Sequence, residues 1–426
     1  MTILVFSLSL LGSMAIGMPI AFALLLSGIA LMHYLDIFDP QIVAQNLING
    51  ADSFPLMAVP FFMLAGELMN TGGLSKRIVN VALAAVGHVK GGLGYVAILA
   101  ACVISALSGS AVADAAALSA LLVPMMVRAG HDKARSAGLI AASSVIGPII
   151  PPSIGFVIFG VIGGVSITKL FLAGLVPGLL IGAALAGAWW WEVRKENIVP
   201  PPRQSAGAVL KALVDGAWAL MLPVIIIVGL KMGVFTPTES AVVAAVYSLF
   251  VATCVYRELK VSELFDVFVA AAKTTSVVMF LVAAALVTSW LITVSDITRD
   301  LVTMLEPLLG QPTLLLLAIM AVVIIVGTAM DMTPTILILT PVLMPIVKAA
   351  GIDPVYFGVL FIVNNSIGLI TPPVGTVLNV VSGVARIRLE PLMRAVTPFM
   401  LVQFAVLFLM VLFPQIVLWP LRFFGH

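Results

Sequence analysis

Long apolar runs separated by short polar links make up most of this chain. Several runs are long enough to cross about 30 Å of hydrocarbon at 1.5 Å per helical residue. The pattern predicts two short helices at 2–15 and 20–34, followed by spans at 55–87, 136–165 and 170–192 in the first half, and spans at 211–233, 238–256, 262–292, 355–384 and 394–421 in the second. It therefore predicts an all-α polytopic membrane protein.

Four further apolar runs are only about half as long, and they occur as two pairs. A run of about 15 residues makes roughly 22 Å of helix, which is too short to cross the hydrocarbon layer comfortably. The pattern therefore predicts two re-entrant hairpins, at 93–127 and 313–347, with their tips at 108–110 and 327–331.

Two of the longer spans carry the same signature in their middle. Residues 143–155 read SSVIGPIIPPSIG, and residues 364–376 read NNSIGLITPPVGT. Proline removes a backbone donor and clashes with the preceding helical turn, and glycine weakens a helix further. The signatures therefore predict discontinuous helices at 136–165 and 355–384.

The two halves of the chain match at a fixed offset of 221 residues. The matched residues are Pro124, Ala129, Gly130, Asp132, Ile146, Gly147, Ile149, Pro151 and Pro152 in the first half and Pro345, Ala350, Gly351, Asp353, Ile367, Gly368, Ile370, Pro372 and Pro373 in the second. Apolar sequence readily gives chance matches of Leu, Val and Ala, but not two copies of this spaced set. The chain is therefore predicted to consist of two structural repeats, 1–193 and 211–426, joined by a link at 194–210.

Basic residues set the expected orientation, because Lys and Arg collect on the cytoplasmic side of a membrane. The basic link at 194–210 is thus expected in the cytoplasm, and the acid-rich segment 296–306 on the outer side. Each half then makes five crossings and one hairpin, an odd number of crossings, so the two repeats are inverted relative to each other. Both termini are expected outside, although Arg422 departs from the rule.

Composition excludes an ordinary soluble domain. Of the 426 residues, 62% are hydrophobic and 9% are charged, against roughly 25% charged in a soluble protein. The 21 Lys and Arg nearly balance the 19 Asp and Glu, which gives no electrostatic reason to expect nucleic acid as a partner. Membrane lipid is the expected environment, and Cys102 and Cys254 are interpreted as small buried hydrophobic residues.

Paired helix breaks at the middle of a membrane, placed in inverted repeats, are the sequence pattern of a secondary transporter's binding site. Unwound backbone at that depth is tolerated where it faces protein or a water-filled cavity. Its carbonyl oxygens suit a cation such as Na⁺, and the N-termini of the broken helices suit an anion.

Residues at the hairpin tips and helix breaks are the candidates for both tasks. We predict sodium ligands at Ser108, Gly109, Ser144, Gly147, Gly327, Thr328, Asp331, Asn364 and Asn365. We predict substrate contacts at Ser110, Asp114, Pro151, Thr371, Pro372, Gly375 and Thr376. No Lys or Arg lies in any of the four tips and breaks, so an anionic substrate would be held by dipoles and hydroxyls, with help from co-bound cations.

Each of these features also has a purely structural interpretation. Pro-Pro within a span is often only a kink, and Ser or Thr in an apolar helix commonly bonds to its own turn. Asp114 and Asp331 follow the two tips in corresponding places, where an Asp serves either a functional site or N-terminal stabilisation. Glu67 and Glu239 favour capping or packing near the interface, and residues 189–191, Trp-Trp-Trp, are typical of an interfacial belt.

Nothing in the sequence indicates enzyme chemistry. The four histidines lie in links or at the chain end, and the chain has no HExxH, GxSxG, GK[ST] phosphate loop or Cys/His metal spacing. An intramembrane enzyme is therefore disfavoured and no organic cofactor is expected. A purely structural membrane scaffold would have no need of paired breaks.

Several stretches carry a family resemblance that extends over nearly the whole chain. They are LAGELMNTGGLSKR (64–77), SGSAVADAAAL (108–118), AGHDKARSAGLIAASSVIGPIIPPS (129–153), GVFTPTESA (233–241) and ITPPVGTVLNV (370–380). The chain resembles the large membrane subunit, the DctM-like subunit, of tripartite ATP-independent periplasmic (TRAP) transporters.

The resemblance implies an elevator-type transporter in a bacterial inner membrane, in which a unit bearing the hairpins and broken helices slides against a scaffold. It implies Na⁺ coupling, a small four-helix membrane subunit, and a periplasmic binding protein that delivers an organic acid. C4-dicarboxylates, sialic acids and sugar acids such as diketogulonate are the substrates of the family. The small subunit is absent from the chain, which implies the unfused form, with both termini in the periplasm.

An alternative within transport stays open. A self-sufficient elevator-type anion symporter of the citrate or arsenite-pump type would share the same repeat logic. The need for a periplasmic binding protein in uptake distinguishes the two.

Overall fold

The computed structural model describes the chain except residues 195, 197, 199, 296, 305, 425 and 426, and the side chains at 105–107, 298, 300, 301, 304, 306, 423 and 424 are left undescribed. The described residues form helices and connecting turns. The first half contains α1 Thr2–Ala15, α2 Ile20–Tyr34, α3 Pro40–Ala51, η1 Phe54–Met57, α4 Ala58–Thr71, α5 Leu74–Val86, α6 Gly92–Ser108, α7 Ala111–Arg128, α8 Lys133–Ser144, α9 Ile154–Gly163 and α10 Ile167–Val193.

The second half of the chain is also helical. Its helices are α11 Ala206–Lys231, α12 Pro237–Phe250, η2 Val251–Val255, η3 Val261–Glu263, α13 Leu264–Val294, α14 Ile297–Met304, α15 Glu306–Leu309, α16 Pro312–Ala329, α17 Met332–Ala349, α18 Pro354–Gly368, α19 Thr376–Ala385, α20 Leu389–Leu412 and α21 Gln415–Phe424. Within the described part of the chain, nine helical stretches are long and apolar enough to cross a membrane. The predicted all-α polytopic membrane protein is confirmed.

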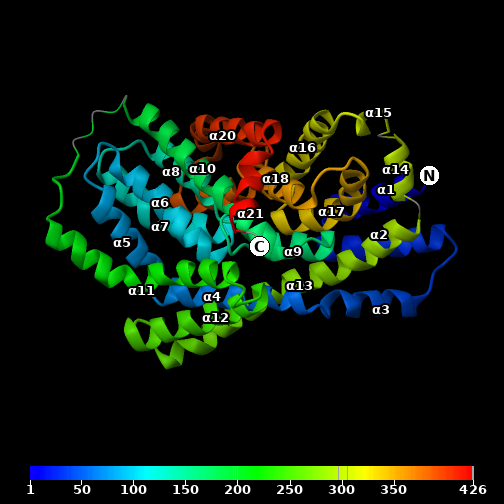
Figure 1. Cartoon of the computed structure of the whole chain (residues 1–426), viewed down its shortest axis with the longest axis horizontal. Helices are drawn as coiled ribbons and strands as arrows, with labels where there is room; N and C mark the ends of the chain where they lie inside the picture. The colour runs from blue at the N-terminus through cyan, green and yellow to red at the C-terminus, as the bar shows by residue number, and fades with distance from the viewer. Residues whose placement is uncertain (195, 197, 199, 296, 305, 425–426) are drawn as a thin grey trace.

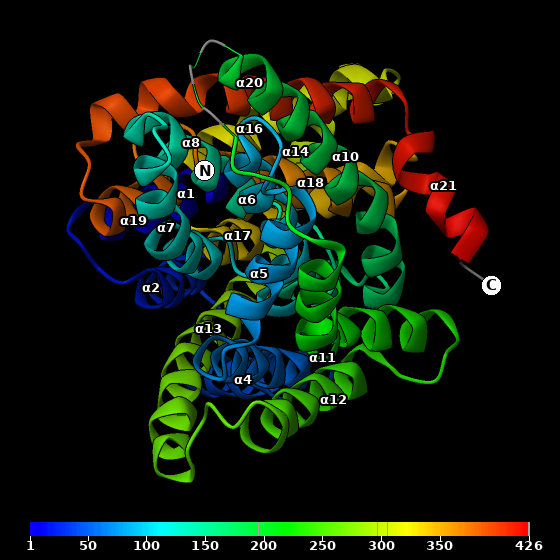
Figure 2. The same ribbon diagram turned by 90° about the vertical axis from the view of Figure 1, so that its left-hand side faces the viewer.

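The helices form two groups that lie one above the other (Figures 1 and 2). A lower layer contains α3, α4, α11, α12 and α13, in which α4 packs on α12 and α13, and α3 packs along α13. An upper body contains α6 to α10 and α16 to α20. The two groups meet where α4 contacts α6 and where α13 contacts α17.

The contacts inside the upper body follow a regular plan. Helix α7 packs against α19, and α17 packs against α9; likewise α8 packs against α20, and α18 against α10. Each of the helices α6 to α10 can be exchanged, in order, with the corresponding helix of α16 to α20. The same pairs of helices are then in contact. Each half thus reaches across to the other half, and the breaks of both halves are brought to the middle of one body.

Both Pro-Pro signatures coincide with interruptions of helix. Helix α8 ends at Ser144 and α9 begins at Ile154, while α18 ends at Gly368 and α19 begins at Thr376. The peptide bonds Pro151–Pro152 and Pro372–Pro373 are both cis.

The helices predicted to form hairpins are somewhat longer than the apolar runs. Helices α6, α7, α16 and α17 have 17 or 18 residues each. Helices α7 and α17 begin directly after the polar tip residues: Ser110 is the N-cap of α7 and accepts a hydrogen bond from the Ala113 N–H, and Asp331 is the N-cap of α17. Re-entrance of the two pairs stays a prediction, since their length no longer argues for it.

Three segments differ from the expected spans. The predicted span 55–87 is divided at Gly73, whose φ of +75° is a left-handed conformation that ends α4 and starts α5 in a new direction. The predicted link after residue 34 contains α3, which starts with Asp39 as its N-cap and Pro40 in its first turn. The last predicted span, 394–421, is divided near Pro414 into α20 and α21.

Trp189 was expected in an interfacial belt, and that expectation is wrong. Its side chain is completely buried, and its indole Nε1–H donates to the Gly91 carbonyl oxygen at 2.8 Å. Its neighbours Trp190 and Trp191 are 54% and 58% exposed. The three residues point to different sides of α10, so only two of them can reach lipid or the interface.

Trp189→Phe should destabilise the protein, because it leaves the buried Gly91 carbonyl without this donor. An unsatisfied buried group costs about 1–3 kcal/mol. The measurement is thermal unfolding of the purified protein in detergent, with Trp190→Phe as the matched control. Equal unfolding midpoints for the two variants would contradict the assigned hydrogen bond.

Candidate functional site

The tip between α6 and α7 lies directly against the first helix break. A methyl group in place of a hydrogen of Gly109 would lie 3.0 Å from the Ile154 nitrogen and 3.2 Å from the Pro152 carbonyl oxygen. Gly109 also has a φ of +60°, which disfavours any side chain. Glycine here permits backbone-to-backbone contact between the tip and the start of α9.

A carboxylate completes this first cluster. Asp114 is buried in the first turn of α7, and its Oδ1 accepts a 2.5 Å hydrogen bond from the Ser108 hydroxyl. A methyl group on Gly147 would lie 2.8 Å from Asp114 Oδ2 and 3.0 Å from the Ser144 carbonyl oxygen. A carboxylate oxygen and a main-chain carbonyl therefore converge beside Gly147.

The tip between α16 and α17 likewise lies against the backbone of the second break. The Gly375 N–H, at the start of α19, donates to the Thr328 carbonyl oxygen at 3.2 Å. A methyl group on Gly368 would lie only 2.9 Å from the carbonyl carbon of Gly327. The two backbones touch, and neither position has room for a side chain.

Two asparagines brace the second cluster. The Asn364 amide donates to the Met320 carbonyl oxygen at 2.7 Å, and the Asn365 amide donates to that of Met332 at 3.2 Å. The Asn365 Oδ1 atom is buried without a hydrogen-bond partner, and a methyl group on Gly327 would lie 3.0 Å from it. A buried amide oxygen without a hydrogen-bond partner, close to the Asn365 backbone carbonyl, is an environment for a cation.

Asp114 and Asp331 do not occupy corresponding places, contrary to the expectation from sequence. At the offset of 221, Asp331 matches Ser110, and Thr335 matches Asp114. The structure agrees with this register, because Ser110 and Asp331 both precede their helices, whereas Asp114 and Thr335 lie one turn inside. The two aspartates therefore have different surroundings.

A cavity of about 590 Å³ joins the two tips, one edge of each break and the lower layer. Its lining residues are Met63, Gly109, Ser110, Ala111, Val112, Pro148, Ile154, Gly155, Lys273, Thr274, Val277, Val278, Leu281, Asp331, Met332, Thr333, Pro334 and Leu369. The walls are mainly apolar, and the polar groups concentrate at the two tips and on α13. This composition is typical of a small-molecule site.

The predicted site residues fall into three groups. Gly109, Ser110 and Asp331 line the cavity. Ser108, Asp114, Ser144, Gly147, Gly327, Thr328, Asn364, Asn365 and Gly375 form the two clusters behind it, through the contacts given above. Pro151, Thr371, Pro372 and Thr376 lie on the breaks but not on the cavity wall: the Thr371 hydroxyl bonds to the Ile367 carbonyl oxygen at 2.8 Å, and the Thr376 Oγ1 is buried without a partner.

Lys273 was missed by reasoning from the sequence. It lies on α13, far from either repeat signature, and the only available signal was a charge within an apolar span. Its place on the cavity wall follows from packing of α13 against α17, which no local pattern reveals.

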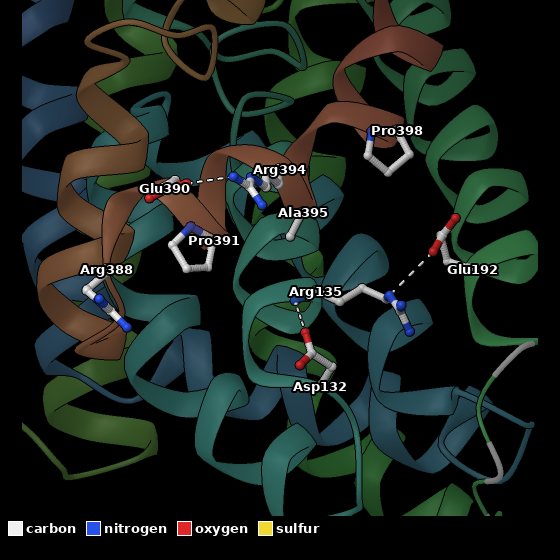
Figure 3. Close-up of a pocket in the computed structure, with 9 residues that line it drawn as sticks. All are labelled: Asp132, Arg135, Glu192, Arg388, Glu390, Pro391, Arg394, Ala395 and Pro398. Carbon is white, nitrogen blue, oxygen red and sulfur yellow. Dashed lines mark hydrogen bonds and ion pairs between the residues drawn. The ribbon is translucent and has the colours of Figure 1, made fainter.

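A second cavity, of about 470 Å³, lies among charged residues near the predicted cytoplasmic link (Figure 3). It is lined by Asp132, Arg135, Glu192, Arg388, Glu390, Pro391, Arg394, Ala395 and Pro398. Its charges largely neutralise one another, since Arg135 pairs with Glu192 and Arg394 with Glu390. None of the predicted site residues lines it.

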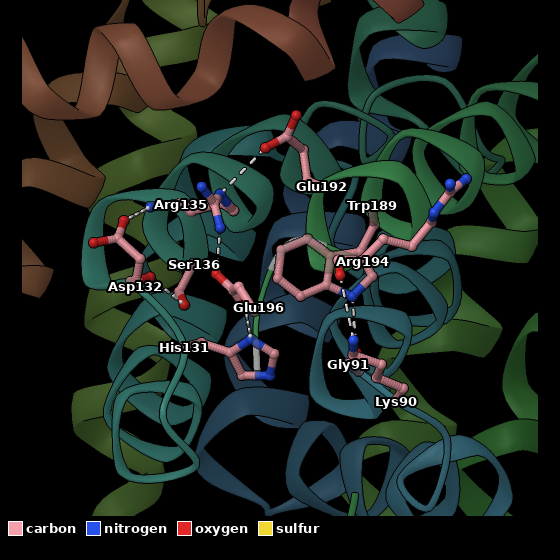
Figure 4. A network of polar contacts seen from close by, with 10 residues as sticks. All are labelled: Lys90, Gly91, His131, Asp132, Arg135, Ser136, Trp189, Glu192, Arg194 and Glu196. Atoms are coloured by element: carbon pink, nitrogen blue, oxygen red, sulfur yellow. Dashed lines mark hydrogen bonds and ion pairs between the residues drawn. The ribbon is translucent and has the colours of Figure 1, made fainter. Parts of the chain in front are cut away.

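The same charges continue into a network that holds the link (Figure 4). Glu196 pairs with the buried His131 through Nδ1 at 2.8 Å and with the Arg135 guanidinium. The Lys90 ammonium donates to the Arg194 carbonyl oxygen at 3.4 Å. These contacts join residues 194 and 196 to two turns, the one between α7 and α8 and, through Lys90, the one between α5 and α6, and we interpret them as structural.

Comparison with known proteins gives a consistent result. Residues 7–416 match the family model of the DctM component of the tripartite ATP-independent periplasmic transporter. The chain is 56% identical to the 2,3-diketo-L-gulonate TRAP transporter large permease protein YiaN of Escherichia coli, over 99% of both chains. It is 39% identical to the sialic acid TRAP transporter large permease protein SiaM of Vibrio cholerae, over 98% of both.

One solved structure shares the overall fold. The YdaH transporter of Alcanivorax borkumensis superposes with a TM-score of 0.63, covering 89% of this chain and 88% of that one. The sequence identity is 14%, so the likeness concerns the fold alone.

Proposed function

The chain belongs to the family of the DctM component of tripartite ATP-independent periplasmic transporters, and we propose that it carries a sugar acid across a bacterial inner membrane together with Na⁺. The family makes it a large permease subunit of a transporter for organic acids, and a permease has no enzymatic step to perform. The observation that carries the finer proposal is the cavity walled by both hairpin tips and by α13.

Sodium coupling is supported by the oxygen atoms at the two clusters. Beside Gly147, Asp114 Oδ2 and the Ser144 carbonyl oxygen converge, and beside Gly327 the orphaned Asn365 Oδ1 is buried. Carboxylate, carbonyl and amide oxygens are the donors that a hard cation needs. Ser108, Asp114 and Ser144 would hold one ion and Asn365 with the Gly327 backbone a second, and the ions would supply the positive charge that the breaks lack.

The substrate class is supported by likeness and by the cavity. The relative that is 56% identical is named for 2,3-diketo-L-gulonate, a sugar acid. In this chain the N-terminal turn of α7 faces the cavity through Ser110, Ala111 and Val112, and a helix N-terminus favours a carboxylate. The Asp331 carboxylate can accept hydrogen bonds from sugar hydroxyls.

An inverted-repeat elevator is supported by the contact plan of the upper body, which is unchanged when α6 to α10 are exchanged with α16 to α20. In this proposal the upper body is the moving unit and the lower layer the scaffold. Because the cavity has walls from both, sliding of the one against the other would carry the substrate from one side of the membrane to the other.

Two partners complete the proposal. Relatives are named large permease proteins of TRAP transporters, which supports a smaller membrane subunit encoded separately. A periplasmic binding protein would deliver the sugar acid to the outer side of the cavity. The link at 194–210 would lie in the cytoplasm, and its contacts with the turn between α7 and α8 would stay on that side.

Uptake by proteoliposomes tests the proposed function. Proteoliposomes that contain the chain and its small membrane subunit, supplied with the periplasmic binding protein, should accumulate labelled 2,3-diketo-L-gulonate when an inward Na⁺ gradient is imposed. Accumulation should stop when Na⁺ is replaced by K⁺, or when the binding protein is omitted. Undiminished uptake without the binding protein would favour a self-sufficient elevator symporter instead, and uptake without Na⁺ would contradict the coupling.

Gly147→Ala should weaken the dependence on Na⁺, because the new methyl group would displace Asp114 Oδ2 or the Ser144 carbonyl from its position. Loss of one charged ligand contact is worth about 1.5–3 kcal/mol, so the Na⁺ concentration for half-maximal uptake should rise about 10- to 100-fold. Gly187→Ala is the matched control, since a methyl group there meets nothing within 4 Å. An unchanged Na⁺ response of Gly147→Ala would remove this cluster from the ion site.

A further inference from the structure

Lys273 is an unusual residue in its helix. Besides Asp266 in the first turn, it is the only charged residue of the 31-residue helix α13. It lies nine positions after Leu264, the first residue of the helix, which places it about 14 Å along the axis. A charge inside a membrane span is costly, and it generally faces a cavity or a partner.

The Lys273 ammonium has no hydrogen bond or ion pair to any other described residue, so no protein group compensates its charge. It is the only cation on the described wall of the 590 Å³ cavity, and Asp331 is the only anion there. The two do not form a salt bridge with each other. Lys273 is exposed, and a lone cation on the mainly apolar wall of a cavity attracts an anionic ligand.

A second part of the cavity wall has the same preference. Ser110 is the N-cap of the 18-residue helix α7, Ala111 and Val112 are its first two residues, and all three line the cavity. The partial positive charge of this helix start adds to that of Lys273. An anionic group between the two would meet donors from both sides.

We propose that Lys273 is the specificity-determining residue of the site, which holds the carboxylate of the substrate against the first turn of α7. This inference rests on the proposed function and deepens it. One cation serves one carboxylate, and a second carboxylate on the same molecule would face Asp331. The site therefore selects hydroxylated monocarboxylates over dicarboxylates, with Asp331 accepting hydrogen bonds from the hydroxyl end.

The assignment also gives the scaffold a part in recognition. Lys273 belongs to the lower layer, whereas Ser110 and Asp331 belong to the upper body. A sliding upper body therefore binds the carboxylate against Lys273 at one stage and leaves it at another. A lysine that only extended along α13 toward the lipid headgroups would neither bind the carboxylate nor part from it during the sliding motion.

Direct binding to the purified complex of large and small subunits tests the assignment, because the periplasmic protein masks the permease's own affinity during uptake. The probes are 2,3-diketo-L-gulonate and its uncharged carboxamide, titrated by calorimetry in NaCl. In Lys273→Met the dissociation constant of the carboxylate should rise about 10- to 100-fold, and that of the amide should stay within about threefold. Lys273→Arg should retain most of the affinity for the carboxylate.

Lys260→Met is the control, since it removes a lysine that lies just before the same helix and outside the cavity. Equal affinity of wild type and Lys273→Met for the carboxylate, including absent binding in both, would overturn the assignment. Equal losses for carboxylate and amide would mean a structural role and also overturn it. Uptake by the wild-type proteoliposomes is measured separately, so failure of the proposed function is distinguished from failure of this residue's role.

Discussion

Interrupted helices inside a membrane leave backbone donors and acceptors that no lipid can satisfy. In this protein short turns within each break satisfy several of them, for example where the Gly147 N–H donates to the Ser144 carbonyl oxygen, and the facing tip satisfies a further one. The start of α19 donates from Gly375 to the Thr328 carbonyl oxygen at one tip, and Gly109 at the other tip lies against the backbone of the first break. Glycine at these contacts is a requirement, because a side chain would separate the backbones. The position of the candidate site follows from this closure.

The closure also explains why the oxygens cluster behind the cavity. Backbone pressed against backbone leaves small polar spaces, into which Asp114 and the Asn365 Oδ1 project. The cavity itself opens on the other side of the tips, toward α13. The proposed ion ligands and substrate contacts are thereby neighbours on the same tips, so that in this proposal occupation of one site would favour occupation of the other. Coupling by this route needs no charged side chain within the breaks.

Sequence alone located the elements that local chemistry determines. The Pro-Pro signatures predicted both interruptions, and Gly109 between its two serines predicted a tip. Reasoning from sequence failed where contacts between distant segments determine the place of a residue. Lys273 reaches the cavity because α13 lines it, and Trp189 is buried where it donates to the Gly91 carbonyl oxygen. The same reasoning also misaligned Asp114 with Asp331, because both lie near a tip although the 221-residue offset pairs them with Thr335 and Ser110.

The account depends on the claim that the space between the two tips and α13 is the substrate site. A cysteine at Val277, which lies on α13, lines that space and is 62% exposed, tests the claim most directly in a protein with Cys102 and Cys254 replaced by alanine. Its rate of reaction with a small thiol reagent should fall about tenfold or more when Na⁺ and 2,3-diketo-L-gulonate are both present, and a cysteine at the exposed Val261 should react at an unchanged rate. Equal protection of both positions, or of neither, would contradict the account.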